Sequence, residues 1–149
     1  MNKNLTAFLA TIAQSEGTEH ISNQQGYNVL CGGGIFISYK DHPRQLIDLP
    51  RLKIKSTAAG RYQILARYFD VYKKQLGLPD FSPDSQDKIA VQLIRECKAL
   101  DDIEAGRFAV AVNKCRSRWA SLPGAGYGQR ENTLAGLEKI YVGAGGVVA

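Results

Sequence analysis

The apolar residues of this chain follow a helical period near both ends and lose it between residues 26 and 57. In that middle stretch, short alternating apolar runs are separated by glycines and prolines, a pattern typical of strands and turns. A helix, a small β section and then several helices predict an α+β fold with the sheet in its own lobe. The length of 149 residues fits a single domain, residues 1–149. A cleft between a β lobe and a helical lobe is a natural place for a polymer to bind.

The predicted helices are defined by their apolar faces and by their ends. The first spans Asn4 to Ser15, with Asn4 as its expected cap and Gly17 as a left-handed stop. Ser82 followed by Pro83 is a strong start signal for another. Further helices are expected at Tyr62–Leu76, Ser82–Cys97, Phe108–Cys115 and Leu134–Ile140, and the tail Gly143–Ala149 is expected to fray.

The β section is expected to contain a hairpin. The alternating apolar residues between Tyr27 and Tyr39 flank the glycines at 32–34, which predicts two strands joined by a Gly-rich turn. Leu52 and Ile54 alternate with lysines, consistent with one more short or edge strand.

Charge and cysteine content exclude several classes. A net charge of +5 and a pI near 9.2 favour polyanionic partners, but the basic residues form no block, so a nucleic-acid-binding function rests on charge alone. Cys31, Cys97 and Cys115 are an odd number and lack zinc-site spacing, which favours a reducing compartment and predicts no metal and no cofactor. No stretch approaches the roughly 20 apolar residues that span a bilayer, so stable membrane insertion is not expected.

Glu16 is the main catalytic candidate. It lies where the first helix is predicted to end, and the negative end of the helix dipole disfavours a carboxylate there. Partial burial in a cleft would also raise its pKa, as a general acid working near neutral pH requires. The ordinary alternative is an exposed glutamate at a helix end. Glu19, in the following loop, is the rival candidate.

Two further motifs fit a glycan-binding surface. Small residues between Ser56 and Gln63 would let a ligand approach backbone amides, and Tyr62 and Gln63 carry groups suited to sugars. Three glycines surround Tyr127 in the segment Pro123–Gln129, as in a loop that holds a ring against a ligand. A capped helix start and a tight turn between helices are the alternatives. Phosphate-loop, dinucleotide and Gly-x-Ser-x-Gly motifs are missing from the sequence.

These three motifs, in this order, resemble the phage lambda type of endolysin. The likeness extends over nearly the whole chain. It includes Ser15–Thr18, Gly26–Tyr27, Asp41–Arg44, Gly60–Leu65, Gln75–Leu78, Asp80–Pro83 and Trp119–Gln129.

The resemblance implies a two-lobed, lysozyme-like fold with a β lobe at about residues 26–57. Members of that family are lytic transglycosylases, which cleave the β-1,4 bond between N-acetylmuramic acid and N-acetylglucosamine and leave a 1,6-anhydro sugar. The family's catalytic glutamate falls on Glu16. Its cleft-lining positions fall on Ser56, Thr57, Tyr62, Gln63 and Tyr127, with Tyr27 and Tyr39 assigned to the small lobe.

This sequence departs from the family pattern at two positions. Asn28 stands where the pattern has Asp after the Gly-Tyr pair, which puts in doubt any mechanism that needs a carboxylate there. Gln14 stands where the family has a tryptophan, which makes the surroundings of Glu16 less apolar.

Three functions stay open from the sequence. Glycoside hydrolysis usually needs two carboxylates, and here the second would come from the Asp41 or Asp48 loop or from further away. A route with Glu16 alone fits a transglycosylase more easily. A hydrolytic muramidase and a non-catalytic wall-binding module are the alternatives.

The resemblance also implies partners and a location. The expected ligand is the glycan strand of peptidoglycan, and the expected state is a monomer. The protein is expected to accumulate in the host cytoplasm until a separate holin permeabilises the inner membrane, without direct contact with that holin.

Overall fold

The computed structural model describes residues 1–125 and 132–149. The chain divides into two compact units, one formed by Met1–Glu16 with Val91–Ala149 and the other by Gly17–Ala90. The division passes through the long helix α3, Pro83–Glu96. Among the described residues, no helix has the length and apolar character needed to cross a membrane.

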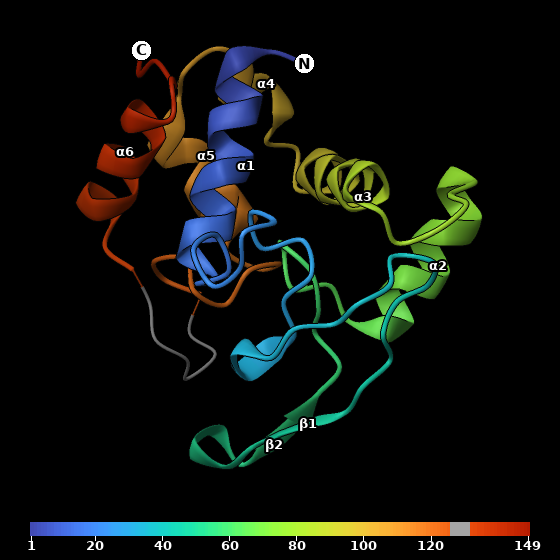
Figure 1. Cartoon of the computed structure of the whole chain (residues 1–149). Coiled ribbons are helices and arrows are strands. Elements are labelled where there is room, and N and C mark those ends of the chain that lie inside the picture. Colours follow the sequence, from blue (N-terminus) through green and yellow to red (C-terminus); the bar gives the residue numbers. More distant parts are fainter. Residues whose placement is uncertain (126–131) are drawn as a thin grey trace. The chain divides into compact units, whose positions relative to one another are not determined.

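The first unit is helical. Its complete helices are α1 (Lys3–Ser15), α4 (Leu100–Glu104), α5 (Phe108–Cys115) and α6 (Leu134–Gly143). Helix α1 packs against α4 and α6, and α5 contacts both α4 and α6 (Figure 1). Phe108 joins the layers, since its ring lies 6.0 Å from that of Phe8 and 4.5 Å from that of Tyr141. All three side chains are buried, so this aromatic group forms the centre of the unit.

Helix α1 begins one residue earlier than predicted, and its capping residue lies two residues earlier. The side chain of Asn2, not Asn4, accepts hydrogen bonds from the first free N–H groups, those of Asn4 and Leu5. Asn4 is instead buried, and its amide donates to the Glu104 carbonyl at 3.3 Å. It therefore connects α1 to α4.

The C-terminal tail is anchored, contrary to the expectation that it frays. The amide of Val147 donates to the side chain of Asn4 at 3.0 Å, and that of Ala149 donates to the Gly106 carbonyl at 2.9 Å. The prediction from sequence position alone was wrong because these backbone bonds hold the tail to the α1 and α4 region.

The second unit contains a small antiparallel hairpin. Strand β1 (Ile47–Leu49) pairs with β2 (Ile54–Ser56), and the register places Asp48 opposite Lys55 (Figure 1). A 3-10 turn at Pro50–Leu52 joins the strands, and Lys53 after it has a φ of 54°. A β-hairpin was expected in this section, but not at this place.

Of the hairpin expected between Tyr27 and Tyr39, only a minimal antiparallel pairing across the Gly-rich turn forms, without regular strands. That segment forms the isolated bridge Val29–Ile35 around a 3-10 turn at Cys31–Gly33. Gly32 has a φ of 83°, which turns the chain, and the Leu30 amide donates to the Gly34 carbonyl at 2.7 Å. The amide of Cys31, however, donates to the Ala58 carbonyl at 3.0 Å. The pairing does not extend into a regular two-strand ladder, because Leu30, next to Val29, forms its bridge with Ala59 instead.

Helix α2 (Ala66–Leu76) begins later than predicted. Ala59 and Ile64 exchange two backbone hydrogen bonds of 3.1 and 2.9 Å, closing a turn that holds Tyr62 outside the helix. The predicted stop is confirmed: Gly77 has a φ of 63°. The predicted start of α3 at Pro83 is also confirmed.

Candidate active site

Glu16 lies at the C-terminal end of α1. Its amide still donates to the Ile12 carbonyl at 2.8 Å, and the next residue, Gly17, has a φ of 78°. The glycine allows the chain to leave the helix directly after the carboxyl-bearing residue. This is the local geometry that the sequence predicted.

A chain of hydroxyl groups leads to the carboxyl of Glu16. The hydroxyl of Ser121 donates to Glu16 Oε2 at 2.6 Å and lies 2.7 Å from the hydroxyl of Ser15. Because each hydroxyl has one proton, Ser15 must be the donor to Ser121 when Ser121 donates to Glu16. Both serines are buried, so the direction of these bonds is fixed by the carboxylate.

Asn132 completes this chain. Its Nδ2 donates to Ser15 Oγ at 3.1 Å, to the Ser15 carbonyl at 3.2 Å and to the Ser121 carbonyl at 3.3 Å. The backbone N–H of Asn132 also donates to the Ser121 carbonyl, at 2.9 Å. The end of α1 and the segment around Ser121 are thus held together beside Glu16 by one side chain.

Burial raises the pKa of Glu16 from 4.5 to about 7, against the hydrogen bond from Ser121, which lowers it. Desolvation disfavours the charged form, while a donor stabilises it. Gln14, two residues earlier on α1, is half-buried. At neutral pH the carboxyl is therefore present in both its protonated and its ionised form.

Glu19 has a different environment from Glu16. It forms an ion pair with Arg61 at 2.8 Å, and the two side chains are 18% and 11% exposed. The preceding residue, Thr18, donates its hydroxyl to the Arg61 carbonyl at 2.6 Å. Glu19 thus anchors the loop after α1, and its carboxylate is occupied by the guanidinium.

Ser56, Thr57 and Gln63 lie on the polar segment around β2 and the following turn. Ser56 Oγ accepts the amide of Ala58 at 3.1 Å, and Thr57 Oγ1 accepts the amide of Ala66, the first residue of α2, at 3.0 Å. Both side chains are half-buried and stabilise local turns.

Gln63 closes the turn before α2. It adopts a φ of 54°, which is uncommon for a residue with a side chain. Its side-chain amide donates to the Gly60 carbonyl at 2.9 Å. Gly60 has a φ of 82°, and a Cβ there would overlap the amide of the fully buried Gln86. The small residues of this motif therefore serve a close backbone approach within the protein.

Tyr27 and Tyr62 donate to one carboxylate. Their hydroxyls lie 2.8 and 2.6 Å from Asp87 Oδ1. The Arg61 guanidinium stacks over both rings, at 5.2 and 5.6 Å from their centres, and also pairs with Glu19. Tyr62 is 1% and Tyr27 8% exposed. The structure thus places both tyrosines in a buried network of aromatic and charged groups.

The two remaining tyrosines among the predicted site residues are placed differently. Tyr39 is half-buried, donates its hydroxyl to Gln24 and packs edge-on against Phe36 at 5.8 Å. Tyr127 lies outside the described residues.

Asn28, which departs from the family pattern, is 6% exposed. Its backbone carbonyl accepts the amide of Phe36 at 2.9 Å. Its side-chain Oδ1 is buried without a hydrogen-bond partner in the described part of the chain. A buried amide oxygen of this kind is uncommon in proteins.

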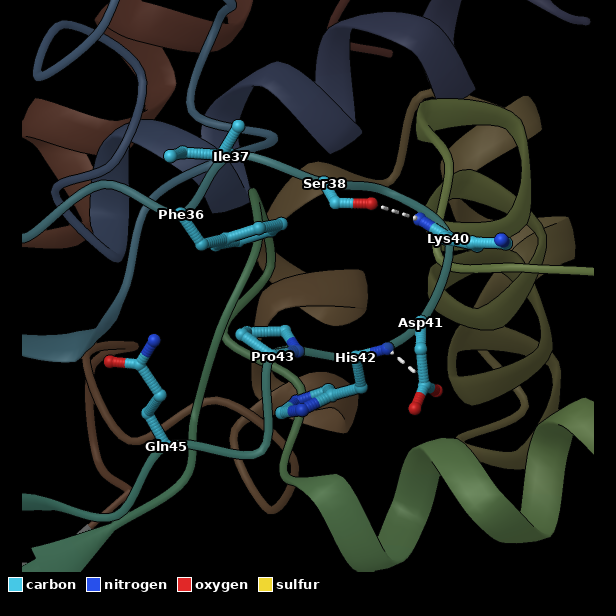
Figure 2. Close-up of a pocket in the computed structure, with 8 residues that line it drawn as sticks. All are labelled: Phe36, Ile37, Ser38, Lys40, Asp41, His42, Pro43 and Gln45. Atoms are coloured by element: carbon cyan, nitrogen blue, oxygen red, sulfur yellow. Dashed lines mark hydrogen bonds between the residues drawn. The ribbon is translucent and has the colours of Figure 1, made fainter.

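A separate open pocket lies on the segment from Phe36 to Gln45 (Figure 2). His42, one of the lining residues, is buried: Nε2 lies 2.8 Å from the Ile64 carbonyl, and Nδ1 accepts the amide of Arg44 at 2.9 Å. These partners fix the tautomer with the proton on Nε2, and burial lowers the pKa of the ring. His42 is therefore a packed structural residue, against Phe81 at 4.8 Å. Over residues 1–125 and 132–149, no group of three histidine, cysteine or acidic residues is placed to hold a metal ion.

Comparison with known proteins identifies the family. A family model described as endolysin matches residues 6–148. The chain belongs to the endolysin family. It is 49% identical to the endolysin of Escherichia phage lambda over 151 residues, which cover 99% of this chain and 95% of that relative. It is 50% identical to the endolysin of Escherichia phage P2 over 159 residues, covering 99% and 96%.

Solved structures confirm the fold. A bacteriophage lambda lysozyme complexed with a chitohexasaccharide matches with a TM-score of 0.96 at 48% identity, covering 100% of this chain and 98% of that one. Another structure of lysozyme from bacteriophage lambda matches with a TM-score of 0.91, the same identity and the same coverage. The α+β, lysozyme-like prediction is therefore confirmed, and family membership makes this chain a peptidoglycan-degrading phage enzyme.

Sequence reasoning missed the residues that hold the carboxyl of Glu16 in place. Ser15 precedes Glu16 directly and Ser121 lies in the matched segment Trp119–Gln129, but neither was singled out. Asn132 follows that segment. The only signal in the sequence was a polar residue next to each motif. That signal becomes specific only when the fold buries these residues and brings them together.

Proposed function

We propose that this endolysin is a lytic transglycosylase that cleaves the β-1,4 bond between N-acetylmuramic acid and N-acetylglucosamine, leaving 1,6-anhydromuramic ends. The observation that carries the proposal is the carboxyl of Glu16, whose pKa is raised to about 7 by burial. A group with that pKa can donate and then accept a proton within one reaction at neutral pH.

The proposed reaction uses Glu16 twice. Protonated Glu16 donates its proton to the glycosidic oxygen as the bond from that oxygen to C1 breaks. The resulting carboxylate then takes the proton of the muramyl 6-hydroxyl, whose oxygen bonds to C1. Ser121 donates to Oε2, so we assign the transferred proton to Oε1. The substrate's own hydroxyl replaces water, and Glu16 ends protonated as it began.

The engagement of the other carboxylates supports a route with one acid. Glu19 is paired with Arg61, and Asp41 accepts both the Arg44 guanidinium at 3.0 Å and the amide of His42 at 2.8 Å. The bond with Arg44 lowers the pKa of Asp41. Asp48, exposed on β1 opposite Lys55, is a surface residue. A retaining or inverting hydrolase needs a second carboxylate available to the sugar or to water.

We propose that residues 1–149 form one catalytic domain that binds peptidoglycan strands. One related structure is of a lysozyme complexed with a chitohexasaccharide, a chain of linked sugars, which supports a glycan ligand here. Ser56, Thr57, Gln63, Tyr39 and Tyr127 are the proposed sugar-binding positions. Tyr27 and Tyr62 would act mainly by shaping that surface, because their hydroxyls are bound to Asp87.

The proposed setting is host cell lysis. The enzyme would accumulate as a monomer in the host cytoplasm and act on periplasmic peptidoglycan after a holin opens the inner membrane. It would bind no nucleic acid and need no cofactor. Family membership supports wall lysis, while the route and the oligomeric state remain proposals.

Mass spectrometry of digested peptidoglycan tests the reaction. The proposal predicts 1,6-anhydromuramic ends from the wild type and none from Glu16→Gln. Reducing muramic acid ends would instead establish a hydrolytic muramidase. Wall lysis that is unchanged in Glu16→Gln would support a mode of action that does not use this residue, including a non-catalytic wall-binding module.

A further inference from the structure

Asn132, two residues before α6, lies at the far end of the hydroxyl chain that leads to Glu16. Its Nδ2 lies 3.2 Å from the Ser15 carbonyl and 3.3 Å from the Ser121 carbonyl. A carbonyl oxygen can only accept a hydrogen bond, so the group that faces both carbonyls must be the NH₂ of the amide and not its oxygen. The orientation of this side chain is therefore determined by its surroundings.

The same NH₂ group determines where the proton of Ser15 goes. Asn132 Nδ2 lies 3.1 Å from Ser15 Oγ, so Ser15 accepts a hydrogen bond there. In the described part of the chain, the other partner of Ser15 Oγ is Ser121 Oγ, at 2.7 Å. Ser15 therefore donates its single proton to Ser121, and Ser121 donates to Glu16 Oε2 at 2.6 Å. Every bond of the chain thus points from Asn132 toward the carboxyl.

From this geometry we propose that Asn132 is a positioning residue for the reaction: by donating to Ser15 it fixes the direction of the hydroxyl chain, keeps Glu16 Oε2 as an acceptor and so holds the transferable proton on Oε1. This role rests on the proposed use of Glu16 as both acid and base. Asn132 acts on the carboxyl through Ser15 and Ser121.

Asn132 opposes a reversed chain. In the reversed state the proton of Glu16 would lie on Oε2 and point at Ser121, and Ser121 would donate to Ser15. A proton in that position is directed into the protein and away from a glycosidic oxygen. Ser15 Oγ would then accept from both Ser121 and Asn132, and its own proton, at a buried position, would have no acceptor among the described residues. An unpaired buried donor is costly, so the reversed state is disfavoured while Asn132 is present.

The protonation midpoint of Glu16 reports the state of this chain. Burial raises the pKa of Glu16 and the Ser121 hydrogen bond lowers it, with no contribution from a charged group among the described residues. A donor that itself receives a hydrogen bond is a stronger donor, because the bonds of a chain polarise one another. Loss of the bonds behind Ser121 should therefore weaken the donor to the carboxylate and raise the midpoint.

A carbon-13 NMR titration of the glutamate carboxyls in the full-length protein tests the proposal. Asn132→Leu keeps a similar size without a donor, and Ser15→Ala removes only the hydroxyl between Asn132 and Ser121. Each should raise the Glu16 midpoint by roughly half a pH unit, although Ser121 stands between either side chain and the carboxyl. Asn113→Leu, at an exposed position on α5, is the matched control and should leave the midpoint unchanged. Circular dichroism checks each fold, and Ser15→Ala, the smaller change, decides if Asn132→Leu does not fold. An unchanged midpoint in either folded variant would overturn the proposal.

The double variant separates this role from a purely structural one. If Asn132 acts through Ser15, adding Asn132→Leu to Ser15→Ala should leave the midpoint where Ser15→Ala alone puts it. Two shifts that add in full would instead assign Asn132 to packing, because its effect would not pass through Ser15.

The pH profile of wall lysis connects the chain to the reaction. Its alkaline limb should move up with the Glu16 midpoint in both single variants. The midpoint is measured without substrate, so a midpoint that fails to move overturns the role of Asn132 alone. A midpoint that moves while the profile stays fixed would overturn the proposed use of Glu16, and with it the role of Asn132 in the reaction.

Discussion

Replacing Glu16 by glutamine should make the protein more stable at neutral and alkaline pH while abolishing its activity. Glutamine has nearly the same shape as protonated glutamic acid and can still accept the hydrogen bond from Ser121. It cannot ionise, however. The variant therefore avoids the cost of placing a charge at a half-buried, desolvated position.

The pKa shift sets the size and the sign of this effect. The pKa of Glu16 is raised from 4.5 to about 7, and each unit corresponds to about 1.36 kcal/mol. Below pH 4.5 the residue is protonated in both states, and no penalty exists. Between pH 4.5 and 7 the folded state binds more protons than the unfolded state, so stability falls as pH rises. Above pH 7 the penalty is complete, at roughly 3 kcal/mol.

Urea unfolding of the wild type and Glu16→Gln, compared at pH 4 and pH 8, measures this difference. We expect near-equal unfolding free energies at pH 4 and a variant more stable by roughly 3 kcal/mol at pH 8. Glu138→Gln, at an exposed position on α6, is the matched control. Its unfolding free energy should equal that of the wild type at both pH values. A Glu16→Gln variant that gains nothing at pH 8 would refute the inference that burial raises this pKa.

Three further substitutions test the supporting structure. Ser121→Ala removes a hydrogen-bond donor that lowers the pKa of Glu16. The pH at which wall-lysis activity falls on the alkaline side should therefore rise by about one unit, and an unchanged pH profile would contradict this. Tyr62→Phe removes a hydroxyl that donates to Asp87 and should lower the unfolding free energy by about 1–2 kcal/mol in urea titration, whereas unchanged stability with a raised KM would assign that hydroxyl to substrate. Gly60 has a φ of 82°, and the methyl group added by Gly60→Ala would overlap the buried side-chain amide of Gln86. The melting temperature of this variant should therefore fall markedly.

Local signals in the sequence were sufficient where the determining interactions are themselves local. Gly17 and Gly77 end helices with a left-handed φ, and Pro83 begins one, as predicted. The placement of Glu16 at a helix end follows from the same rule. Each of these features depends on the backbone preference of one residue, which the sequence states directly.

Features that depend on distant partners could not be predicted in this way. The hairpin was placed at Tyr27–Tyr39 because alternation reveals an extended chain but not the strand with which it pairs. The hydroxyl chain to Glu16 joins Ser15 to Ser121, positions separated by more than a hundred residues, and is visible only in the folded structure. Tyr62 was expected on a helix face but belongs to a buried network with Asp87.

A site-resolved titration of the Glu16 carboxyl would show directly whether this group is held protonated near neutral pH. Carbon-13 NMR of the glutamate carboxyl groups, with Glu16→Gln used to assign the signal, gives the protonation midpoint of this one side chain. We expect a midpoint near pH 7. A midpoint near 4.5, the ordinary value for a solvated glutamate, would contradict it and remove the basis for a residue that acts as both acid and base.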